Sequence, residues 1–190
     1  NNGDGSSPAP LTIADYQAVG VTGVSADNLE AVNANVLSAL TGEADTVSEI
    51  QALVAEGEDA LAKIEAYNNG DGVSPAPLSV LDYSGAGIDG VNVGNLAAVN
   101  LHILGASIGG ADTVAEVDAI VATALAALAK VEAFNNGNGS VPAPLSIQDY
   151  LDVAVTGVNA DNLAAVNAQV LASATGDTDT VDEIQGKVND

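Results

Sequence analysis

The residues best suited to chemistry lie in a glycine-rich stretch that occurs three times along the chain. Its second occurrence reads Asn68-Asn69-Gly70-Asp71-Gly72 and is followed by Asp82. Calcium prefers six to eight oxygen ligands, and Asn, Asp and backbone carbonyls at a glycine turn can supply them. Calcium is therefore the one cofactor that we expect these stretches could bind. The candidate ligands across the three occurrences are Asp4, Asp15, Asn69, Asp71, Asp82, Asn138 and Asp149.

These stretches resemble the oxygen-rich calcium loops of EF-hand and dockerin type, but the spacing differs. Tyr67 stands where the first acidic ligand is expected, and Leu78 stands where the last one is expected. Asp82 reaches that last position only if about four residues count as an insertion. Asp82 also suits a structural role near the start of a helix, where it would complete a capping box. The alternative hypothesis is a glycine turn that ends a helix and binds no metal.

Few side chains are available for catalysis. The chain has no cysteine and no arginine, and its single histidine, His102, corresponds to Asn35 and Gln169 elsewhere in the chain. Lys63 and Lys130 fit solvated helix faces. Nucleophile–base pairs could use only Ser, Lys or carboxylates, and none stands at a catalytic spacing. We expect a protein that is not an enzyme.

The glycine-rich stretch opens a repeat of 67 residues, which is the step from Asn1 to Asn68 and from Asn68 to Asn135. The Pro-Ala-Pro element at Pro8 returns with the same step at Pro75 and Pro142. Self-similarity at a fixed period is the signature of a repeat architecture. We predict three domains, one for each copy, with the third copy incomplete in its last helix. They cover residues 1–67, 68–134 and 135–190.

Each copy carries start signals for three helices. Capping boxes, in which Thr or Ser is followed three residues later by Asp or Glu, open the first and third helices. Ser25, Asn92 and Asn159 are candidate N-caps of the second helix. The boxes are Thr12/Asp15, Ser79/Asp82 and Ser146/Asp149 for the first helix, and Thr46/Glu49, Thr113/Glu116 and Thr180/Glu183 for the third.

The third helix is the longest in each copy. From Val47 to Ile64 its apolar residues alternate steps of three and four, which is a heptad-like seam. Gly70 can take the left-handed conformation that ends the helix. The predicted fold class is all-α: tandem three-helix bundles joined by connectors that contain Gly and Pro, in an elongated array.

The charge excludes several classes of partner. The chain has 26 acidic and 3 basic residues, for a formal net charge of -23, so nucleic acid and anionic membranes would repel it. Its longest run of low polarity, residues 119–129, falls short of the ~20 residues that a membrane span needs. The opening Asn1-Asn2-Gly3 has no signal-peptide features, and we expect a segment of a longer chain. Neighbouring repeats of the same chain are the predicted partners.

The repeated strings resemble the tandem repeats of giant type I-secreted surface adhesins, of biofilm or RTX type, from marine Gram-negative bacteria. The resemblance covers the whole chain, and it implies an extracellular, non-enzymatic cell-surface module that acts as a stalk or spacer. Calcium commonly accompanies such adhesins, but the tandem nonapeptide calcium motif is missing from these copies. The strings that carry the resemblance stand at Asn68 to Leu78, Asp82-Tyr83, Val19 to Val24, Asn162 to Asn167 and Asp45 to Gln51.

The chain also resembles a second family. That family is the albumin-binding three-helix module of Gram-positive surface proteins. The similar features are a short first helix, the Gly-Val-Thr that follows it, and a last helix that starts with Thr-Val-x-Glu-Ile. The basic residues and the surface aromatic of that module have no match here. The alternatives to a spacer are therefore a module that binds a host or cell-surface protein and a linker rigidified by calcium.

Overall fold

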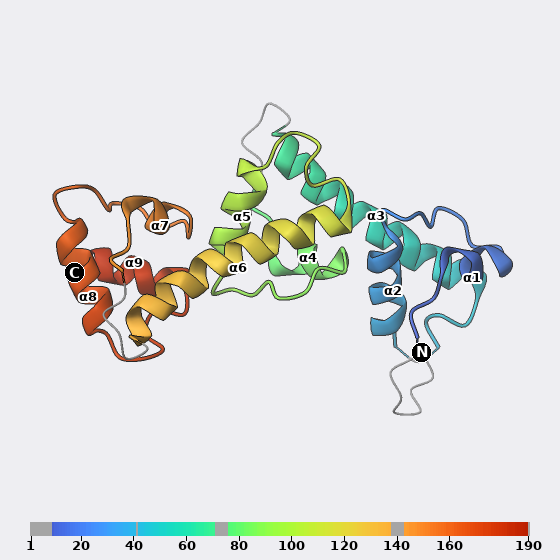
Figure 1. Ribbon diagram of the computed structural model, residues 1–190. Helices are drawn as coiled ribbons and strands as arrows, with labels where there is room; N and C mark the ends of the chain where they lie inside the picture. The colour runs from blue at the N-terminus through green and yellow to red at the C-terminus, as the bar shows by residue number, and fades with distance from the viewer. Residues whose placement is uncertain (1–8, 41, 71–75, 138–142, 190) are drawn as a thin grey trace. The chain divides into compact units, whose positions relative to one another are not determined.

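A computed structural model describes residues 9–40, 42–70, 76–137 and 143–189 of the chain. In these residues the regular structure is helical and contains no strand, so the all-α prediction is confirmed. Figure 1 shows the helices in chain order. They are α1 (Ile13–Ala18), α2 (Leu29–Ser38), α3 (Val47–Asn69), α4 (Val80–Gly85), α5 (Leu96–Gly105), α6 (Val114–Asn136), α7 (Ile147–Leu151), α8 (Leu163–Ala172) and α9 (Val181–Asn189).

Capping boxes start the first and third helices of each copy, as predicted. At α1, the Asp15 carboxylate accepts a hydrogen bond from the Thr12 backbone N–H at 2.8 Å, and the Thr12 hydroxyl accepts one from the Asp15 N–H at 3.3 Å. Thr46 and Glu49 make the same reciprocal pair at α3. Each box satisfies amides that the first helical turn leaves without partners.

The second helix begins later than predicted, because α2 starts at Leu29 and not directly after Ser25. The side chain of Asn28 explains the difference. Its Oδ1 accepts a hydrogen bond from the Ser25 N–H at 2.8 Å, and its Nδ2 donates to the Gly23 carbonyl at 2.9 Å. These local bonds hold the intervening residues in a turn, which competes with the helix.

The long helix α3 buries most of the predicted seam. Val54, Leu61 and Ile64 are buried, whereas Val47 at its start is exposed. Gly70 ends the helix with φ 54° and ψ 57°, which confirms the predicted left-handed stop.

The chain forms two compact units. Unit 1 comprises Asn1–Gly90 and Ala106–Asp118, and unit 2 comprises Val91–Gly105 and Ala119–Asp190. In unit 1, both α2 and α4 pack on α3, and a core forms around Tyr16, Val21, Val32 and Val54. In unit 2, α8 packs on α9. Each unit therefore contains residues from two successive copies of the repeat.

Candidate functional site

Polar side chains suited to chemistry meet where the start of one copy packs on the preceding copy, and we call these contacts the junction. In unit 1, Lys63 of α3 belongs to the first copy and Asp82 of α4 to the second. The Lys63 ammonium pairs with Asp82 Oδ1, while Asp82 Oδ2 accepts a hydrogen bond from the Ser79 N–H at 2.7 Å. The aspartate therefore caps its own helix with one oxygen and binds the preceding copy with the other.

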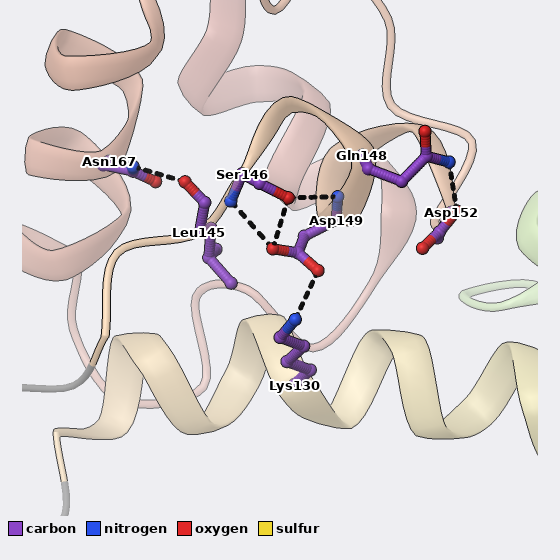
Figure 2. A network of polar contacts seen from close by, with 7 residues as sticks. All are labelled: Lys130, Leu145, Ser146, Gln148, Asp149, Asp152 and Asn167. Carbon is purple, nitrogen blue, oxygen red and sulfur yellow. Dashed lines mark hydrogen bonds and ion pairs between the residues drawn. The ribbon is translucent and has the colours of Figure 1, made fainter.

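Unit 2 contains the same arrangement one repeat later, as Figure 2 shows. Lys130 of α6 pairs with Asp149 Oδ1 at 2.5 Å, and Asp149 Oδ2 accepts from the Ser146 N–H at 2.7 Å. Asn167 of α8 donates to the Leu145 carbonyl at 2.9 Å, which fixes the chain just before α7. The two junctions therefore share the same lysine–aspartate–serine contacts.

The lysine changes the titration of the aspartate. Partial burial acts to raise the pKa of Asp82, but hydrogen bonds from Lys63 and Ser79 outweigh burial and leave the pKa below its ordinary value. The pKa of Asp149 is lowered in the same way, with Lys130 as the largest opposing cause. The pKa of Asp15 in the first copy is also lowered, but there the Thr12 hydrogen bonds are the cause. The ionised aspartates therefore stabilise the folded state.

Backbones also approach closely at the junction of unit 1. Gly87 follows α4 with φ +75°, and a Cβ atom added there would lie 2.8 Å from the Cα atom of Ala31 in α2. Only glycine fits such an approach without a shift of one helix. The third copy has Ala154 at the corresponding position, and it adopts a positive φ of 62°.

A backbone hydrogen bond between copies recurs in both units. The Val114 N–H donates to the Asp27 carbonyl at 3.3 Å in unit 1. The Val181 N–H donates to the Gly94 carbonyl at 2.9 Å in unit 2. Both pairs are related by the 67-residue repeat step, so the start of each of these third helices is held by the copy before it.

Amide side chains at the end of α3 make further contacts in unit 1, and these lie within the second copy. Asn68 Nδ2 donates to the Ala106 carbonyl at 3.3 Å, and Asn69 Oδ1 accepts from the Gly109 N–H at 3.0 Å. In unit 2, Asn135 Nδ2 donates to the Ser173 carbonyl at 3.0 Å, which is the corresponding contact. The ends of α3 and α6 are thereby tied to the segments that follow α5 and α8.

The calcium candidates are divided among several roles. Asp15, Asp82 and Asp149 complete capping boxes, and Asn69 binds a backbone amide. Asp4, Asp71 and Asn138 lie outside the described residues. In the part of the chain that the structure describes, no group of three or more His, Cys, Asp or Glu is placed to hold a metal ion. Calcium binding stays a prediction, and thermal melts with calcium and with a chelator test it.

His102 joins structural contacts of unit 2. Its Nε2 atom lies 2.9 Å from the Asp152 carbonyl oxygen, and its side chain is half-buried. The corresponding Asn35 of the first copy donates to the Leu53 carbonyl at 3.2 Å. Both side chains thus bond to a backbone carbonyl, although the carbonyls belong to different segments.

Asp118 departs from the pattern of the other copies. The corresponding Gln51 binds the backbone of Thr22, accepting from its N–H at 3.0 Å and donating to its carbonyl at 2.9 Å. The second copy has Asp89 in place of that threonine. Burial and the charges of Glu30 and Asp89 raise the pKa of Asp118. An ionised Asp118 therefore disfavours folding.

The junction ion pairs were not predicted from the sequence, which assigns Lys63 and Lys130 to solvated helix faces. A signal exists, because each lysine precedes a capping-box aspartate by 19 residues. That spacing joins residues of different copies, so a search for motifs within one copy does not find it.

Comparison with protein-family models, with curated proteins and with solved structures gives no match to this chain. None of the helices in the described ranges combines the length and the apolar character that crossing a membrane requires.

Proposed function

We propose that this chain is a non-enzymatic repeat segment that acts outside the cell as a stalk or spacer of a large bacterial surface adhesin. The proposal includes the architecture of tandem three-helix bundles, joined by connectors with Gly and Pro, in an elongated array. The resemblance of the repeated strings to adhesin repeats supports this function. A recurring feature of the structure supports it independently.

That feature is the recurrence of the junction. The pairs Lys63–Asp82 and Lys130–Asp149 are one repeat apart, and so are the two backbone bonds between copies. A contact that recurs at a constant step lets copies be added to a chain while each contacts only its neighbours. Lys63, Lys130 and their aspartate partners are engaged in these contacts. Each added copy then increases the distance that the segment spans.

Small-angle scattering of the chain tests the proposed array. A compact domain of 190 residues has a radius of gyration of about 16 Å. We expect a clearly larger value, with the distance distribution of an extended particle. A radius near the compact value contradicts the spacer.

A module that binds a host protein is the second candidate, and one observation favours it. Leu37, Leu104 and Leu171 occupy the same position in the three second helices, and each is more than 40% exposed. Capture of a serum protein by the chain, abolished when all three leucines are changed to serine, would favour this candidate. No capture by either chain favours the spacer.

A further inference from the structure

One face of the first copy differs from the same face of the other copies, although its residues are similar. Leu11, Val19 and Val47 are 43%, 53% and 45% exposed. The corresponding residues of the third copy, Leu145, Val153 and Val181, are 2%, 0% and 7% exposed. Those of the second copy, Leu78, Ala86 and Val114, are buried as well.

In the second and third copies this face lies beside the junction. Leu78 immediately precedes the capping box that binds Lys63, and Ala86 lies next to Gly87, which approaches the backbone of Ala31. Val114 donates its backbone N–H to the Asp27 carbonyl. The preceding copy therefore contacts this face through its second helix, the turn before that helix and the second half of its long helix.

The first copy has the same docking features without an occupant among the described residues. Gly20 has φ +86°, like Gly87, but a Cβ atom added there would meet no atom within 4 Å. Asp15 completes a capping box like Asp82, whereas among the described residues only Asp82 and Asp149 pair with a lysine. The face thus presents apolar side chains, a glycine and a carboxylate in the arrangement that receives a preceding repeat elsewhere.

We infer that the face formed by Leu11, Asp15, Val19, Gly20 and Val47 is a docking surface for another copy of this repeat. The occupant supplies a lysine equivalent to Lys63 opposite Asp15, and a second-helix backbone equivalent to that at Ala31 opposite Gly20. The inference rests on the repeat-array part of the proposed function, and it names the partner of this face of the first copy. Charge complementarity favours this occupant. Lysine is rare in this chain of net charge -23, yet two of its three lysines pair with the aspartates that correspond to Asp15.

Thiol labelling tests the inference, because the chain has no cysteine of its own. The probe is a second copy of residues 1–67 fused ahead of Asn1, so that Tyr67 precedes Asn1 as it precedes Asn68. The added Lys63 then stands 19 residues before Asp15, the separation found at both junctions. A single Val19→Cys substitution in the original copy reports whether the face is covered.

We expect the Val19→Cys thiol to react about tenfold more slowly with a maleimide in the extended chain than in the original chain. Leu37→Cys is the matched control and should react at the same rate in both chains. Changing the added Lys63 to Glu should restore part of the Val19→Cys reactivity, because Asp15 then faces a like charge. Amide hydrogen exchange over residues 13–21, measured on cysteine-free chains, should slow on extension.

Equal labelling of Val19→Cys in both chains, with unchanged exchange over residues 13–21, would overturn the inference. Protection that instead grows with the concentration of the unextended chain would assign the face to self-association, and would overturn the choice of occupant. These results are separable from the proposed function. If Val19→Cys is not protected in a chain that still scatters as an extended particle, the docking surface is excluded. The proposed spacer function is then unaffected.

Discussion

One position of the repeat holds Gly20, Gly87 and Ala154 in the three copies, and its surroundings differ from copy to copy. All three have positive φ, but only the second is a glycine pressed against another backbone. Alanine in the left-handed region suffers repulsion between its Cβ and the carbonyl oxygen. The third copy therefore carries local strain that the first two avoid.

Ala154→Gly should stabilise unit 2 by about 1 kcal/mol, because relief of strain exceeds the added chain entropy of glycine. Urea unfolding followed by circular dichroism measures the change.

In unit 1, Gly87→Ala should lower the unfolding free energy more than Gly20→Ala does, since only Gly87 faces Ala31. Equal costs at the two glycines would show that the close approach has no energetic consequence.

Thr178 is fully buried, and its hydroxyl has no hydrogen-bond partner among the described residues. The corresponding residues are Ala44 and Ala111. Thr178→Val keeps the side-chain volume and removes the hydroxyl, so we expect a gain of about 1 kcal/mol in unfolding free energy. Thr178→Ser keeps the hydroxyl and should show no gain. A loss of stability in the valine variant would indicate a partner for the hydroxyl.

Asp118→Gln should raise stability near pH 7 by up to about 1 kcal/mol, because it removes a like charge and restores a glutamine. In copies one and three the corresponding Gln51 and Gln185 accept hydrogen bonds from the backbone N–H groups of Thr22 and Thr156. The pKa of Asp118 is raised in the folded state, so its contribution is favourable below the unfolded pKa and is lost as pH rises through the folded pKa. The gain should therefore shrink towards pH 3. Unfolding midpoints across this range provide the measurement, and an equal gain at both ends would contradict the electrostatic cause.

At the scale of helices, local signals were predictable from sequence and non-local ones were not. The boxes at Thr12 and Thr46 depend on residues three apart, so the sequence alone locates them. The later start of α2 depends on the Asn28 side chain bonding backwards to Ser25 and Gly23, which no helical pattern reveals. The junction joins residues of different copies, so it required the structure.

Asp82→Ala should destabilise unit 1 by about 2 kcal/mol, and Asp15→Ala by about 1 kcal/mol, because both remove a cap but only Asp82 also pairs with a lysine. In a Lys63→Ala background the two substitutions should lower the unfolding free energy by equal amounts.

The contribution of Asp82 to stability also depends on pH. Because its pKa is lowered in the folded state, this contribution is present above the unfolded pKa of about 4 and is lost as pH falls through the folded pKa. Urea titrations at pH 7 and at pH 2 check both statements. A difference that persists at pH 2 would contradict the ion-pair explanation.

At the scale of the whole molecule, the limits of the compact units differ from the limits of the sequence repeat. Unit 1 takes in α4 and the start of α6 from the second copy, whereas α5 belongs to unit 2. The repeat step is readable from sequence because it is a matter of residue identity. The unit limits depend on which helices pack together, and here the start of one copy packs on the copy before it.

Scattering from chains of increasing copy number tests the central claim, that junctions join successive copies into an extended array. If successive copies form the proposed extended array, doubling the number of copies should multiply the radius of gyration by about two, as for a rod. Compact packing would multiply it by only about 1.3, and an unstructured string by about 1.5. We expect a factor near two, and a factor near 1.3 would rule out the extended array.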